Sequence, residues 1–118
     1  QLAWDQKFSP IFVGDVVDGL LAVVRHDLSG LFHLAGLEPF SRVELFGLLT
    51  AQLRDRFGDI PQVNIQICRI NDLNLVEKRP IDCSMNSGKL VRTVGLSLHS
   101  AESCCRPLVD SLHTWPPC

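Results

Sequence analysis

The sequence contains no tyrosine, which excludes a tyrosine phenol as a catalytic acid or base. It also lacks the glycine patterns GxGxxG and GxxxxGK[ST], which cradle nucleotide phosphates at a helix start. The motifs GxSxG and HExxH are missing too, so neither a serine-hydrolase elbow nor a zincin site is present. No two carboxylates are spaced for acid/base work. The chain therefore carries no recognisable catalytic centre of its own.

An excess of charge of one sign is also missing. The net charge is -2 and the pI is about 6.0, so no basic field exists to hold nucleic acid or an anionic membrane surface. No apolar run approaches the roughly 20 residues that span a bilayer, and no signal peptide is visible. We therefore expect neither nucleic acid nor a membrane among the partners of the chain.

The cysteines show no spacing typical of a set of disulfides or of a metal site. Their number is odd, five, with no CxxC pair, which argues against a set of disulfides and against a zinc site. The four histidines have no ligand spacing to the cysteines. We therefore expect inert thiols in a reducing compartment, a cytoplasmic protein and no bound metal.

Apolar spacing predicts alternating helices and strands in the first half of the chain. Asp15 is expected to cap a helix whose apolar stripe continues to residue 24 and which ends at Ser29-Gly30. Residues 11–13 could add a very short strand before it. The run LFHLAG, residues 31–36, predicts a strand buried on both faces.

The second half begins with the strongest local signal. Ser41 and Glu44 form a capping box, so a helix is expected over residues 42–57, ended by Gly58. The alternation in VNIQICRI predicts a strand over residues 63–70, and a loop follows over residues 71–80. Two further helices are expected, at about 87–94 and from Ser100 to about 112, the second kinked or delayed by Pro107. Residues 115–117 predict an irregular tail. The fold class is α/β, with few short strands and about four helices.

Two loops gather polar side chains beside apolar elements, where ligand-contacting groups tend to sit. One is WDQKFSP, residues 4–10, and the other is VEKRPIDCSMNSGKL, residues 76–90. Arg79 stands before a proline, so its backbone is biased toward an extended form, and its guanidinium could pair bidentately with a phosphate. A surface Arg-Pro turn is the alternative.

Several segments together resemble a known family. They are DQKFSPIFVGDVVDGLL, SGLFHLAGLEPFSRVELFGLL, KRPIDCSMNSGKL and a closing VGL, in this order. The chain is similar over nearly its whole length to the C-terminal part of the dTDP-4-dehydrorhamnose reductase family, within the extended short-chain dehydrogenase/reductases. The regulatory beta subunit of methionine adenosyltransferase shares the same signature.

The resemblance implies that residues 1–118 are the substrate-binding, C-terminal portion of a Rossmann-type reductase. The NADP-binding N-terminal part would then be absent, in keeping with a chain that has no initiator methionine and only Met85. By position in the family, Gln6, Ser9, Pro10 and Arg79 are expected to contact a nucleotide-sugar. No catalytic, cofactor-binding or metal-binding residue is expected here, because NADP belongs to the absent part. The expected partner is that missing Rossmann half or a partner subunit.

The function implied is the sugar-nucleotide-binding portion of an NADPH-dependent reductase that is inactive alone. The alternative is a non-catalytic regulatory or structural subunit that keeps the fold, like the methionine adenosyltransferase beta subunit. Two departures from the family pattern favour this alternative: Phe8 stands where the family has glycine, and Ile11 where it has threonine.

Overall fold

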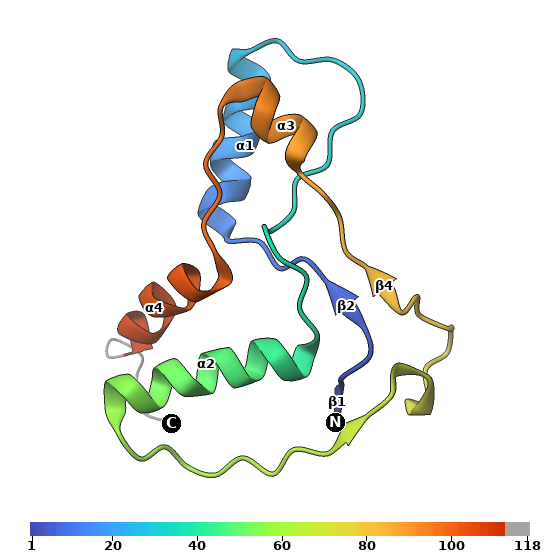
Figure 1. Ribbon diagram of the computed structural model, residues 1–118, viewed down its shortest axis with the longest axis vertical. Helices are drawn as coiled ribbons and strands as arrows, with labels where there is room; N and C mark the ends of the chain where they lie inside the picture. Colours follow the sequence, from blue (N-terminus) through green and yellow to red (C-terminus); the bar gives the residue numbers. More distant parts are fainter. Residues whose placement is uncertain (113–118) are drawn as a thin grey trace.

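The computed structural model of the chain describes residues 1–112, in which helices predominate and strands are very short (Figure 1). The strands are β1 (Leu2–Ala3), β2 (Lys7–Phe8), β3 (Ile67–Cys68) and β4 (Asp82–Cys83). The helices are α1 (Val13–Arg25), α2 (Arg42–Phe57), α3 (Gly88–Val94) and α4 (Ala101–Ser111), with a 3-10 turn η1 (Ile70–Asp72). The expected α/β class with few short strands is confirmed for this part of the chain.

The strands form two separate parallel pairs. β1 lies beside β3, and β2 lies beside β4. Phe8 of β2 also forms an isolated antiparallel bridge with Phe40, just before α2. Pairs this short are not stable by themselves, so their role is to fix the first eight residues between the two later segments. This arrangement brings residues 1–8 next to the start of α2 and next to residues 80–83.

The strand predictions were partly wrong. Residues 11–13 and 31–36 form no strand, and the strand expected over residues 63–70 is reduced to β3. In the 31–36 segment a side chain takes the place of a neighbouring strand. The Ser87 hydroxyl accepts a hydrogen bond from the Ala35 N–H at 2.6 Å and donates to the Ala35 carbonyl at 2.9 Å. Ile67 in β3 is 60% exposed, so the strand is not buried.

The N-cap prediction for α1 was also wrong. The helix begins at Val13, and its N-cap residue is Phe12, which makes no side-chain cap hydrogen bond. Asp15 therefore lies inside the first turn, where it is 1% exposed. Its carboxylate accepts hydrogen bonds from the His99 backbone N–H at 2.8 Å and from the His99 ring Nδ1 at 2.5 Å. The acid ties α1 to the segment between α3 and α4.

The predicted end of α1 at Ser29-Gly30 was wrong as well, because the helix ends at Arg25 with His26 as its C-cap residue. The ends of α2, α3 and α4 follow the local signals. The Ser41 capping box is present at the start of α2, and Gly58 ends the helix with a φ of 74°. α3 ends at Gly95 in the left-handed conformation. The Ser100 side chain caps α4, which continues through Pro107 without a delayed start. The predicted tail at residues 115–117 lies outside the described residues. Between residues 1 and 112 no helix is long and apolar enough to cross a bilayer.

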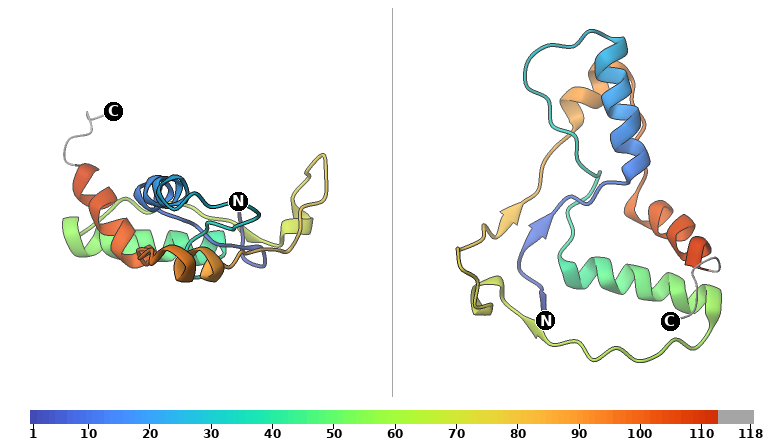
Figure 2. Two further views of the ribbon diagram at one scale, coloured as in Figure 1. Left: turned by 90° about the horizontal axis from the view of Figure 1, so that it is seen from above. Right: turned by 180° about the vertical axis from the view of Figure 1, so that it is seen from behind.

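The described chain is flat and open. Its radius of gyration is 17.0 Å and its extents are 48 × 37 × 21 Å, whereas a compact domain of this length has a radius of gyration of about 13–14 Å. α4 packs on α2, and α3 packs on α1, so the helices form two pairs at opposite ends of a thin molecule (Figure 2). The buried apolar side chains are correspondingly few and small, and include Ala3, Ala35, Ile70, Leu90 and Val109.

Candidate functional site

A cavity of about 620 Å³ lies where β1, β2, the start of α2, η1 and residues 73–83 meet. Its volume is in the range of small-molecule sites. Within the described part of the chain its charged lining residues are both arginines, Arg42 and Arg79, and none is acidic. Its walls also include apolar side chains, from Phe8, Ile70, Leu73 and Leu75. The combination favours an anion that also carries an apolar or planar part.

Gln6 lines this cavity and is 5% exposed. Its Nε2 donates a hydrogen bond to the Pro80 carbonyl at 2.9 Å, and its Oε1 accepts one from Arg42 Nη1 at 2.5 Å. A buried amide with both ends paired is a fixed group. Gln6 therefore holds the 79–80 segment and the Arg42 guanidinium in place relative to each other.

Arg42 is the first residue of α2, and its guanidinium lies over the Phe8 ring, 5.8 Å from the centroid. This contact and the bond to Gln6 hold the side chain without neutralising its charge. Arg79 lines the same cavity from the residue before Pro80. No ion pair involving Arg42 or Arg79 is found among residues 1–112. Both positive charges are therefore free to meet an anion.

A second network fixes the start of α2 on β2. Ser41 Oγ accepts a hydrogen bond from the Glu44 N–H at 3.2 Å, and Glu44 Oε2 accepts one from the Ser41 N–H at 2.6 Å. Lys7 Nζ donates to both Glu44 oxygens, at 2.7 and 2.5 Å. The Lys7 hydrogen bond, followed by those from Ser41, lowers the pKa of Glu44 from 4.5 to about 2.

This network predicts acid sensitivity. Because the folded-state pKa of Glu44 is the lower one, the unfolded chain binds more protons between pH 4.5 and about 2. The stabilisation is therefore complete above the unfolded-state pKa and is lost as the pH falls through this window. Glu44→Gln should lose stability less steeply than the wild type over the same window, as measured by urea unfolding at stepped pH. Glu38→Gln, at an exposed site, is the matched control; equal slopes for all three proteins would contradict the prediction.

The four predicted site residues do not share one cavity. Gln6 and Arg79 line the cavity described above, whereas Pro10 lines a different, apolar cavity of about 350 Å³ beside α2 and α4. Ser9 lines neither of these two cavities, and its Oγ accepts a hydrogen bond from the Met85 N–H at 3.2 Å. The Ser9 hydroxyl thus holds the 84–86 segment.

Sequence reasoning missed Arg42. In the sequence it reads as an ordinary first-turn residue after a capping serine, and Gln6 is 36 residues away. The bridge between Phe8 and Phe40, with the Lys7–Glu44 contact beside it, brings the two together. Arg42 is adjacent in sequence to neither of the two loops expected to contact a ligand, residues 4–10 and 76–90, so no local signal marked it.

Metal-binding and thiol chemistry have little support in the described residues. No group of three or more histidine, cysteine or acidic side chains is placed to hold a metal ion in residues 1–112. Cys68, Cys83, Cys104 and Cys105 are free thiols. Burial raises the pKa of the Cys104 and Cys105 thiols, which lowers their reactivity.

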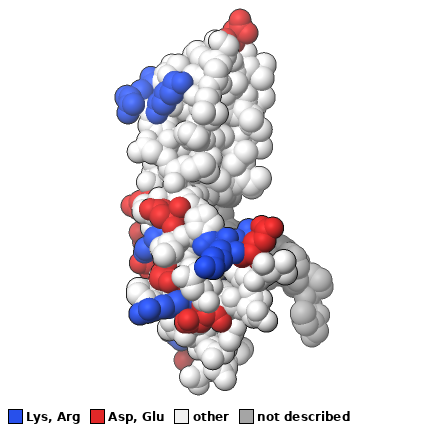
Figure 3. Space-filling view, turned by 90° about the vertical axis from the view of Figure 1, so that its right-hand side faces the viewer, with Lys and Arg blue, Asp and Glu red and all other residues white. Residues whose placement is uncertain are grey.

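Charged side chains of both signs gather over the lower half of the face shown in Figure 3.

Comparison with known proteins does not assign the chain to a family. No protein-family model matches it, and no curated protein matches it significantly.

Proposed function

We propose that the chain is the sugar-nucleotide-binding portion of a dTDP-4-dehydrorhamnose reductase-like NAD(P)-dependent oxidoreductase. In this proposal the chain is cytoplasmic, is the C-terminal portion of a Rossmann-type fold and is inactive alone. NADP would be held by an N-terminal Rossmann part outside this chain. The observation that carries the proposal is the cavity that joins Arg42, Arg79 and the buried Gln6.

The chemistry of the cavity fits a nucleotide diphosphate. A guanidinium presents parallel N–H donors that match two phosphate oxygens. Arg42 is preorganised by Gln6 and Phe8, which reduces the entropy that ligand binding would otherwise cost. The apolar walls at Leu73 and Leu75 would contact the faces of a base or a deoxysugar.

The residues that line the cavity indicate which steps of the reaction this chain could serve and which would need the N-terminal part. In the proposed reductase the N-terminal part would hold NADPH as the source of hydride for the keto carbon of the sugar, and a proton would be needed at the keto oxygen. The described lining of the cavity contains no carboxylate, histidine or lysine. The residues of this chain would therefore bind and orient the nucleotide-sugar, and the proton donor would lie in the N-terminal part.

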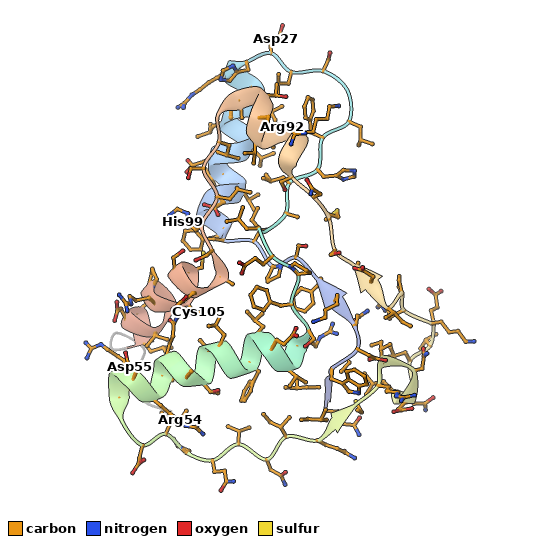
Figure 4. The ribbon with its side chains drawn as sticks, in the orientation of Figure 1. Asp27, Arg54, Asp55, Arg92, His99 and Cys105 are labelled. Carbon is orange, nitrogen blue, oxygen red and sulfur yellow. The ribbon has the colours of Figure 1, made fainter. Side chains whose placement is uncertain are left out.

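The proposal predicts that the chain binds dTDP and dTDP-glucose through both arginines. Arg42→Ala and Arg79→Ala should each weaken binding by about tenfold or more, because each removes a charge-assisted hydrogen bond. Isothermal titration calorimetry with both ligands measures this. Arg54→Ala is the matched control, since Arg54 lies at the far end of α2 (Figure 4) and does not line the cavity. Equal affinities for the three variants, or no binding by the wild type, would contradict the proposal.

A non-catalytic regulatory or structural subunit with the same fold is the second candidate. The open shape and the exposed apolar side chains favour it, because a subunit of an assembly covers such surfaces with a partner. The two candidates separate when the chain is produced together with the coding region upstream of Gln1. Oxidation of NADPH by that protein with a 4-keto-deoxysugar nucleotide supports the reductase. Nucleotide-sugar binding without turnover supports the subunit.

A further inference from the structure

A second cavity, of about 350 Å³, lies where the residues just before α1 meet α2 and α4 (Figure 4). Its volume is at the lower end of the range of small-molecule sites. Aliphatic and aromatic side chains from both helix pairs form most of its walls, among them Phe12, Val13, Leu45, Leu49 and Leu108. In the described lining, His99 is the only residue whose side chain carries a nitrogen or an oxygen. A ligand of this cavity should therefore be apolar except for one polar group.

The His99 ring is held by a buried carboxylate. Asp15 Oδ1 lies 2.5 Å from Nδ1 of the ring, and Asp15 Oδ2 accepts a hydrogen bond from the His99 backbone N–H at 2.8 Å. Because a carboxylate only accepts hydrogen bonds, Nδ1 carries the proton, and Nε2 of the neutral ring keeps a lone pair. Nothing within residues 1–112 donates a hydrogen bond to Nε2. The side chain is 57% exposed, so a ligand can reach this acceptor.

The acceptor on His99 and the charge of Asp15 together select the polar group of the ligand. A hydroxyl can donate a hydrogen bond to Nε2 and brings no charge into the apolar cavity. A carboxylate has no proton to donate and would approach the negative charge of Asp15. An ammonium group could donate a hydrogen bond, but it would lose its hydration against apolar walls. The chemistry of the lining therefore favours a neutral alcohol or phenol.

We propose that this cavity binds a small apolar alcohol or phenol whose hydroxyl donates a hydrogen bond to His99 Nε2. Such a ligand would contact the start of α1 at Phe12 and the other helix pair at Leu49 and Leu108, and so would strengthen the junction between the two pairs. The proposal is independent of the nucleotide-sugar site, because the two cavities share no lining residue. A ligand of about eight non-hydrogen atoms should bind with a Kd of about 0.1–1 mM.

Titration of the isotope-labelled full chain with p-cresol and with toluene, followed by NMR, tests this proposal. The two probes differ only in the hydroxyl, and we expect both to change the chemical shifts of the residues that line the cavity. His99→Phe should weaken p-cresol binding about tenfold or more, because the hydroxyl would be buried without a partner. Toluene needs no acceptor, so its Kd should change by less than about threefold.

Blocking the cavity is the second test. Leu49→Trp places a larger side chain in it and should weaken the binding of both probes about tenfold or more. Val76→Trp, at a fully exposed loop residue, is the matched control and should leave both Kd values unchanged. Circular dichroism shows whether each variant keeps its helices, and His99→Phe decides alone if Leu49→Trp unfolds.

Two results would overturn the proposal. The first is that neither probe changes the chemical shifts of the lining residues at concentrations up to about 2 mM. The second is that His99→Phe weakens the binding of p-cresol and of toluene equally, because the hydroxyl would then have no partner at Nε2.

Discussion

Gly36→Ala is expected to destabilise the chain by at least about 3 kcal/mol and to leave little folded protein at 37 °C. A Cβ atom at this position would lie 1.8 Å from the Pro10 carbonyl oxygen and 2.8 Å from its carbon. Both are backbone atoms, so the rotation of a side chain cannot relieve the clash. The Gly36 N–H also donates to the Ser9 carbonyl at 3.3 Å, which holds the two segments at this close approach.

Neither segment has room to move. Ala35 is bound to Ser87 through its N–H and its carbonyl, and Ser9 is bound to the Met85 backbone. Urea unfolding followed by circular dichroism measures the effect. Gly47→Ala is the matched control: nothing lies within 4 Å of a Cβ there, and alanine in a helix interior should add up to about 1 kcal/mol. If Gly36→Ala were as stable as Gly47→Ala, the close approach to Pro10 would be wrong.

Asp15→Ala is expected to cost about 2–4 kcal/mol, because it removes a buried carboxylate that accepts two hydrogen bonds. The backbone N–H of His99 would lose its partner inside the structure. His99 lies in the segment that enters α4 (Figure 4). The loss should therefore loosen the connection between the α1–α3 pair and the α2–α4 pair, and faster amide hydrogen exchange in α4 would report it.

Two further variants show how much of the loss in stability comes from each hydrogen bond of Asp15. His99→Ala keeps the bond from the residue 99 N–H and removes only the ring contact, whose side chain is 57% exposed, so we expect a cost of about 1 kcal/mol. Asp18→Ala, in the same helix but exposed, should be nearly neutral. A cost for Asp15→Ala no greater than that for Asp18→Ala would show that the buried carboxylate does not hold His99.

Helix ends were predictable because their signals are local. The Ser41 capping box, the glycines that end α2 and α3, and the Ser100 cap each depend on residues within one turn. The prediction that Asp15 caps α1 was wrong because a carboxylate that can cap a helix can also bind a residue far along the chain. Here the carboxylate accepts a hydrogen bond from the backbone N–H of His99, 84 positions later.

Strands and the candidate site were less predictable because both depend on distant parts of the chain. LFHLAG has the composition of a buried strand, yet it acquires no strand neighbour, and the Ser87 side chain satisfies Ala35 instead. The resemblance placed Gln6 and Arg79 beside one ligand, and both line one cavity. Arg42 was missed because its position there depends on the pairing of Phe8 with Phe40.

The pairing of β1 with β3 and of β2 with β4 has a consequence for biosynthesis. Ile70 donates to Asp5 across 65 positions, Gln6 to Pro80 across 74, and Met85 to Ser9 across 76. A ribosome releases the beginning of a chain first, and contacts between distant residues form slowly. Residues 5–9 therefore leave the ribosome without these three partners and stay unpaired with them until residues 70–85 have been translated. Chaperones that hold nascent chains have a correspondingly long opportunity to bind this segment.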